Sequence, residues 1–103
     1  MRRHQRILVP NGRVIRVAAV NPDERANLEG VVTVIGLGGM FIRTANLRPT
    51  GTILQLRIED PLVTFESECT VRSVASNGLG VEFTRITHEN DLKLRSFLSS
   101  MKH

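Results

Sequence analysis

The feature that most constrains the fold of this chain is a clear alternation of apolar and polar side chains through two segments, Thr52–Glu59 and Val63–Val74. A period of two is typical of a β-strand with one buried face. Because Asp60-Pro61 interrupts the pattern, the sequence predicts two separate strands. The residues expected on the buried faces are Leu54, Leu56 and Ile58 in the first segment and Val63, Phe65, Ser67, Cys69 and Val71 in the second.

Turn residues indicate how these strands connect. Asn77-Gly78 is the strongest hairpin signal in the chain, because both residues tolerate the positive φ of a type I′ turn. It joins the second alternating segment to a further strand over Leu79–Thr84. Before the first segment, Arg48–Gly51 is expected to be a turn in which the glycine takes the left-handed conformation. Three more strands are expected upstream, over Arg13–Val20, Leu28–Ile35 and Met40–Thr44.

The C-terminal segment changes period and predicts a helix over residues 88–102. Its apolar side chains recur at the i, i+3, i+4 and i+7 spacing of one helical face. Thr87 is the expected N-cap, and Glu89 and Asp91 in the first turn complement the helix dipole. The apolar face consists of Leu94, Phe97, Leu98 and Met101.

These elements predict an all-β fold in which six antiparallel strands close into a small split β-barrel. Closure hides the strand edges, and the C-terminal helix would lay its apolar face over one end or seam. With 103 residues the chain is large enough for one core and not for two. We therefore expect a single domain over residues 11–103, preceded by an arm over residues 1–10.

The arm is strongly basic. The chain carries a formal net charge of +4, and five arginines precede the first acidic residue, Asp23. A positive field at one end of a domain favours anionic partners, although many basic N-termini are only solvated tails. These arginines are Arg2, Arg3, Arg6, Arg13 and Arg16.

Three glycines, Gly36, Gly38 and Gly39, separate the strands expected over Leu28–Ile35 and Met40–Thr44. Glycine reaches positive φ without a Cβ penalty and leaves room for another group to approach the backbone. The segment is therefore either a plain turn or a junction shaped for a ligand. A glycine turn together with an arginine arm favours an anion site.

Other functional classes find little support in the sequence. The three histidines, His4, His88 and His103, lack the spacing of a metal site, and no Ser/His/Asp or Cys/His arrangement indicates catalysis, so we expect neither a metal nor an enzyme. The single cysteine, Cys69, is expected to be a buried structural thiol. No apolar run approaches the roughly 20 residues that span a bilayer, and no signal region follows the basic start, so we expect a cytoplasmic protein.

Nucleic-acid binding is a rival interpretation for a small basic barrel. Proteins of that kind stack bases on aromatic side chains. Here tyrosine and tryptophan are absent. Of the phenylalanines, Phe65, Phe83 and Phe97 fall at expected core positions, which leaves only Phe41 for stacking. We rank this interpretation below the one that follows.

Three features of the chain together resemble the PilZ domain, a bacterial receptor module for the second messenger cyclic di-GMP. The first is Arg2-Arg3-His4-Gln5-Arg6, which fits the RxxxR pattern of the family through Arg2 and Arg6. The second is the glycine pair and apolar strand over residues 38–42. The third is the hairpin over residues 77–84, followed by a helix.

The resemblance implies a non-enzymatic signalling module that binds cyclic di-GMP. It makes Arg2 and Arg6 the principal ligand contacts, with support from Arg3 and from the glycine turn at Gly36, Gly38 and Gly39. An arginine fork matches both a phosphate and the O6 and N7 acceptors of guanine. The disordered arm would order around the nucleotide and so change a contact with an unidentified protein partner. The module itself would be a monomer or a homodimer.

The second motif departs from the family pattern of an Asp or Asn, one residue, a Ser, two residues and a Gly. Val34 stands at the acidic or amide position and Gly36 at the serine position, so only Gly39 is retained. In the family that first side chain hydrogen-bonds a guanine edge. Losing such a bond costs about 1.5–3 kcal/mol, or roughly tenfold to hundredfold in affinity. The alternative is therefore a degenerate PilZ domain that binds no nucleotide and acts as a protein-interaction adaptor.

Overall fold

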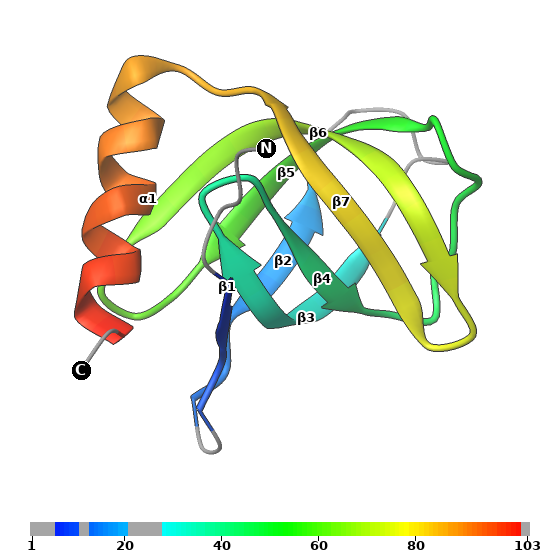
Figure 1. Ribbon diagram of the computed structural model, residues 1–103, viewed down its shortest axis with the longest axis horizontal. Coiled ribbons are helices and arrows are strands. Elements are labelled where there is room, and N and C mark those ends of the chain that lie inside the picture. Colours follow the sequence, from blue (N-terminus) through cyan, green and yellow to red (C-terminus); the bar gives the residue numbers. More distant parts are fainter. Residues whose placement is uncertain (1–5, 11–12, 21–27, 102–103) are drawn as a thin grey trace.

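The computed structural model describes residues 6–10, 13–20 and 28–101. They form strands arranged around a single core, with one helix packed against them (Figure 1). In chain order the elements are β1 (Arg6–Leu8), β2 (Arg16–Ala19), β3 (Glu29–Gly36), β4 (Gly39–Arg43), β5 (Ile53–Glu59), β6 (Thr64–Ala75), β7 (Gly78–Arg85) and α1 (His88–Met101).

The sheet closes into a barrel. Its strand order is β1-β3-β2-β5-β6-β7-β4, and an additional pairing of β3 with β4 joins the two sides. Strands β2 to β7 therefore form a closed antiparallel barrel, and β1 is an extra strand attached to β3. The predicted six-stranded barrel with a C-terminal helix is confirmed. Strand β1 was not expected, because three residues are too few to show an alternation.

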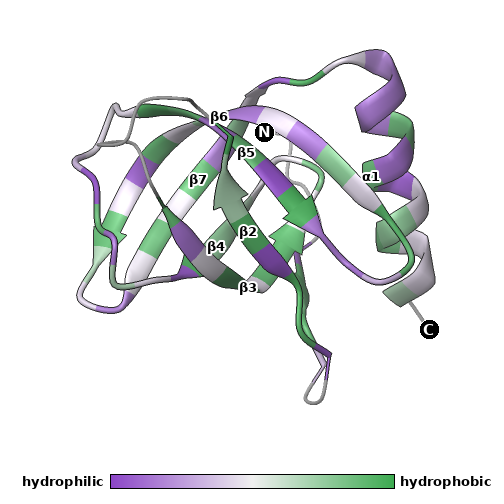
Figure 2. Ribbon diagram, turned by 180° about the vertical axis from the view of Figure 1, so that it is seen from behind, coloured by the Kyte–Doolittle hydropathy of each residue, from purple (hydrophilic) through white to green (hydrophobic). Residues whose placement is uncertain are grey.

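The barrel core follows the alternation seen in the sequence, which is visible as bands of hydropathy along the strands in Figure 2. On β5 and β6 the apolar set points inward, and Phe65 packs against Phe83 and Phe97 with ring centroids 6.3 and 6.2 Å apart. These contacts join the barrel wall to the helix. The buried residues of the two strands are Leu54, Leu56, Ile58, Phe65, Ser67, Cys69, Thr70 and Val71.

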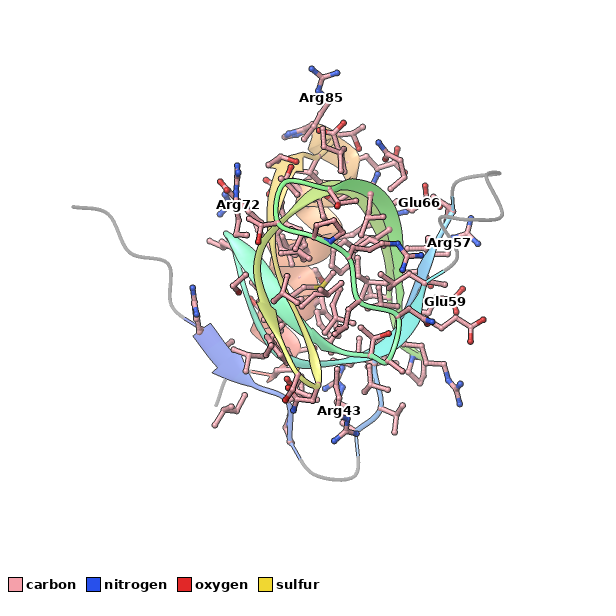
Figure 3. The ribbon with its side chains drawn as sticks, turned by 90° about the vertical axis from the view of Figure 1, so that its right-hand side faces the viewer. Arg43, Arg57, Glu59, Glu66, Arg72 and Arg85 are labelled. Atoms are coloured by element: carbon pink, nitrogen blue, oxygen red, sulfur yellow. The ribbon has the colours of Figure 1, made fainter. Side chains whose placement is uncertain are left out.

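Helix α1 lies across one end of the barrel, which Figure 3 shows in a view along the opening. All four residues of the predicted apolar face are buried. Thr87 caps the helix as expected: its Oγ1 accepts a hydrogen bond of 3.2 Å from the backbone N–H of Asn90. The end of the predicted helix at residue 102 falls outside the described residues, which end the helix at Met101.

Arg13 has a structural role that the charge pattern did not indicate. Its guanidinium donates to both carboxylate oxygens of Asp60, at 3.1 and 3.2 Å, and lies 5.3 Å from the centroid of the Phe97 ring. The Asp60 side chain is almost fully buried. Arg13 therefore compensates a buried charge between the barrel and the helix, and it does not add to an anion site at the arm.

Two turns test the glycine expectations. Gly51 has a φ of 95°, as predicted, and the backbone N–H of Thr52 donates to the carbonyl of Pro49 at 3.1 Å. The prediction of a type I′ turn at Asn77-Gly78 was wrong, since among the described residues Gly51 alone has a positive φ. Instead Ala75 pairs with Gly78 across a two-residue turn.

Gly78 is glycine for another reason. A Cβ at this position would meet the carbonyl oxygen of Ile42 and would lie 2.7 Å from the ring of Phe41. The close contact of β7 with β4, and not the conformation of the turn, excludes a side chain here.

Candidate glycine groove

Strand β1 brings the basic arm to the glycine turn. In the antiparallel register of β1 and β3, Arg6 lies opposite Gly36 and Leu8 lies opposite Val34. The two features that the sequence singled out are thus adjacent in space. Of the arm arginines proposed as ligand contacts, Arg2 and Arg3 lie outside the described residues, and Arg6 is exposed at the start of β1.

A groove of about 980 Å³ begins at this point. It runs over the outer face of β3, β4, β7 and β6 and is bordered by β1. Its lining includes every described residue of the predicted site, namely Arg6, Gly36, Gly38 and Gly39. We call it the glycine groove and define it by these four residues together with Gly80, Arg72 and Glu82.

The groove exists because glycine occupies outward positions of neighbouring strands. The neighbours of Gly39 and Gly80 along their strands, Met40 and Val81 among them, are buried, so positions 39 and 80 face outward. A Cβ on Gly39 would meet the carbonyl oxygen of Val81 across the β4–β7 pairing. A Cβ on Gly80 would meet only the hydroxyl of Ser73. Missing side chains at these positions leave a floor made of backbone.

Three charged side chains border this floor. Arg6 makes no ion pair with a described residue. Arg72 on β6 donates from Nε to Oε1 of Glu82 on β7, at 2.7 Å, and both side chains are about half exposed. The described part of the groove therefore carries two positive charges and one negative charge, which favours an anionic ligand.

Sequence reasoning placed Arg72 on the solvent face of its strand, but it did not assign Arg72 or Glu82 to the site. Their position depends on how β6 and β7 pair, and two features of this pairing were not predicted. The turn lies one residue earlier along the chain than expected, and the register shifts between Val71 and Ser73, at Arg72.

Apolar side chains form the rest of the wall. Val34, Phe41 and Phe83 line the groove and are half-buried. Phe83 was expected at a core position, and it packs against the core, where its ring meets Phe65 edge-on with an interplanar angle of 73°. It is only half-buried and also lines the groove. Val34 lies at the groove itself, where the resemblance calls for a polar side chain.

Cys69 lies in the core beneath β6 and is fully buried. Burial raises the pKa of this thiol from 9.0 to about 12; the side chain of Ser67 opposes the shift, and the carboxylate of Glu68 adds to it. The thiol is therefore protonated at neutral pH and is a poor nucleophile. Among the described residues, no group of three or more His, Cys, Asp and Glu side chains is arranged to hold a metal ion.

The PilZ domain model matches residues 1–100. The chain is a member of the PilZ domain family. This match spans the arm, the barrel and nearly all of the helix. In a comparison with curated proteins, no significant match was found. Within the described part of the chain, no helix has the length and apolar character needed to cross a membrane.

Solved PilZ structures share the fold at low sequence identity. The first is YcgR from Escherichia coli in complex with c-di-GMP, with a TM-score of 0.76 and 20% identity; the match covers 96% of this chain and 45% of that one. The second is the PilZ domain of E. coli YcgR with c-di-GMP, with a TM-score of 0.75 and 16% identity; the match covers 97% of this chain and 90% of that one. The third is the PilZ domain of CeSA from a cellulose-synthesizing bacterium, with a TM-score of 0.70 and 11% identity; the match covers 96% of this chain and 99% of that one. The chain thus spans less than half of the full YcgR chain.

Proposed function

We propose that this PilZ domain is a non-enzymatic receptor module that binds cyclic di-GMP in the glycine groove. The observation that carries the proposal is the register of β1 on β3, which sets Arg6 opposite Gly36 at the edge of a groove of about 980 Å³. The YcgR structures, which contain c-di-GMP, share this fold and support the same assignment.

The groove offers a suitable surface for each part of the ligand. Cyclic di-GMP carries two phosphates and two guanines, and the guanidinium of Arg6, an exposed residue, suits either a phosphate or the O6 and N7 edge of a guanine. The floor at Gly36 and Gly39 allows a planar group to approach the backbone closely. Phe41 and Phe83 present apolar surface to the faces of the bases. Arg2 and Arg3 would add further positive charge from the arm.

Binding would be relayed through the arm. Among the described residues, strand β1 pairs with the barrel through β3 alone, and residues 1–5 precede Arg6 in the sequence. A nucleotide held between the arm and the groove fixes the arm over this face, which changes the surface offered to a protein partner. The partner contact therefore depends on ligand without any change in the barrel.

One observation favours a second function. Val34 lines the groove where the family pattern has a side chain that hydrogen-bonds guanine. If no other residue supplies that contact, the domain is an adaptor whose basic arm and apolar groove wall contact a protein directly. The two functions differ in whether the groove binds the nucleotide at all.

The test is a calorimetric titration of the full chain with cyclic di-GMP, with the Arg6→Ala variant alongside. Arg57→Ala is the matched control, because it removes the same charge from a half-exposed position on β5. Saturable binding that Arg6→Ala weakens and Arg57→Ala preserves supports the receptor. No binding by the unmodified protein refutes the receptor and leaves the adaptor.

A further inference from the structure

We propose that Glu82 supplies the carboxylate that recognises the guanine base, in place of the side chain that Val34 cannot provide. This proposal rests on the proposed binding of cyclic di-GMP in the glycine groove. It assigns the ligand contact to β7, a strand that contributes no residue to either nucleotide-binding motif of the resemblance.

The strand register places Glu82 across the floor from Arg6. Arg6 lies opposite Gly36 on β3, and Glu82 lies opposite Gly39 on β4. Gly36 and Gly39 are the last and first residues of strands that meet at one turn. With strands about 4.8 Å apart, β1 and β7 are separated by about 14 Å of glycine-floored surface. A base on this floor lies between a guanidinium and a carboxylate.

Arg72 orients the carboxylate of Glu82 through a hydrogen bond. Its Nε donates to Oε1 of Glu82 at 2.7 Å. Among the described residues, Oε2 of Glu82 accepts no hydrogen bond, and half of the side chain is exposed. An oriented carboxylate with an available oxygen is an acceptor ready for a ligand donor.

The chemistry fits guanine specifically. The Watson–Crick edge of guanine carries two adjacent donors, N1–H and the 2-amino group, and a carboxylate accepts from both. Adenine presents an acceptor at N1 and has no 2-amino group, so it cannot make this contact. A charge-assisted pair of this kind is stronger than a neutral hydrogen bond. Glu82 would therefore determine which base the groove accepts, while Arg6 binds the anion.

The experiment compares the affinities of cyclic di-GMP and cyclic di-IMP, in which hypoxanthine replaces guanine and the 2-amino group is absent. Both ligands carry the same charge, so removing a negative charge from the groove changes both affinities alike. Only a contact with the 2-amino group changes their ratio. The variants are Glu82→Gln and Glu82→Ala, and Glu66→Gln is the matched control from the other exposed arginine–glutamate pair of β6.

The unmodified protein and the control are expected to prefer cyclic di-GMP by about tenfold, and both Glu82 variants are expected to lose most of that preference. Thermal unfolding confirms that each variant is folded. If the Glu82 variants bind cyclic di-GMP equally well or more tightly and keep the preference, the inference is overturned while the receptor function stands. If the unmodified protein binds neither ligand, both proposals are refuted.

Discussion

Two arginine–glutamate pairs on opposite sides of the barrel have similar geometry and very different surroundings (Figure 3). Arg72 and Glu82 are joined at 2.7 Å with 56% and 50% of their side chains exposed, and Arg57 and Glu66 at 2.9 Å with 45% and 47% exposed. Each pair links neighbouring antiparallel strands. The pairs themselves therefore give no reason to assign a function to one and not to the other.

The difference lies in what surrounds each pair. Around Arg57 and Glu66, the outward positions of β5 carry exposed polar side chains, Gln55 and Glu59. Beside Arg72 and Glu82, the outward positions are glycines, and a groove opens next to them. A groove on the outer face of this barrel therefore forms chiefly where glycines take the outward positions, and charged side chains lie at its border.

The largest expected effect comes from removing the positive charge of Arg6 at the groove. Arg6→Ala is expected to weaken cyclic di-GMP binding by roughly tenfold to hundredfold, because a charge-assisted contact of about 1.5–3 kcal/mol is lost. Calorimetry measures this loss. Arg57→Ala on the other face should leave the affinity within about twofold. Equal losses in the two variants would mean that only net charge attracts the ligand, and the comparison between the faces would fail.

The glycine floor can be tested through stability. Gly39→Ala places a Cβ against the carbonyl of Val81, which cannot move aside, so we expect a loss of about 1–3 kcal/mol in the free energy of unfolding. Gly80→Ala meets only the hydroxyl of Ser73, which can rotate away, and should change stability by about 0.5 kcal/mol at most. Urea denaturation distinguishes them. Similar effects in both variants would refute the packing argument for Gly39.

Strand β6 runs from one face to the other, with Cys69 buried between Glu66 and Arg72. The pKa of this thiol is about 12 in the folded chain against 9.0 for a free thiol. Above about pH 9 the unfolded chain loses a proton that the folded chain keeps. The free energy of unfolding should therefore fall by up to about 1.4 kcal/mol per pH unit in that range.

Urea denaturation between about pH 8 and about pH 10.5 measures the slope of the unfolding free energy against pH. The chain has no tyrosine, so tyrosine titration does not contribute to this slope. Cys69→Ala should flatten the slope even though it also lowers stability at neutral pH. An equally steep slope in that variant would show that the thiol is not its source.

The smallest effect concerns the ion pairs as stabilising elements. Glu82→Ala and Glu66→Ala are each expected to reduce the free energy of unfolding by less than about 1 kcal/mol, because both pairs are half exposed and screened by solvent. Their effects on stability should match while their effects on ligand preference differ. A much larger loss for Glu82→Ala would make the groove pair a structural element.

Most of the barrel was predictable because its strands have one buried face. The alternation over β5 and β6 and the stripe on α1 each identify a buried surface, and a closed barrel with a helix at its end is the arrangement that covers both. Strand β1 was not predictable, since Arg6–Leu8 is too short to carry a period and pairs only through long-range contact.

The site was predictable in part. The arginine arm and the glycine turn are local features, so Arg6, Gly36 and Gly39 could be named from the sequence, and the structure brings them together. Arg72 and Glu82 could not be assigned, because their position beside the groove depends on how β6 and β7 pair. Arg13 was counted with the basic residues near the arm, although its guanidinium donates a hydrogen bond to Asp60, which is distant in sequence.

The most direct test of the central claim is to map the ligand on the two faces by NMR, following backbone amide shifts of the labelled chain during titration with cyclic di-GMP. The account predicts shifts concentrated at Gly36, Gly38, Gly39, Gly80 and Glu82, with the amides of Arg57 and Glu66 unchanged. Shifts centred on Arg57 and Glu66, or a spectrum without any change at saturating ligand, would contradict it.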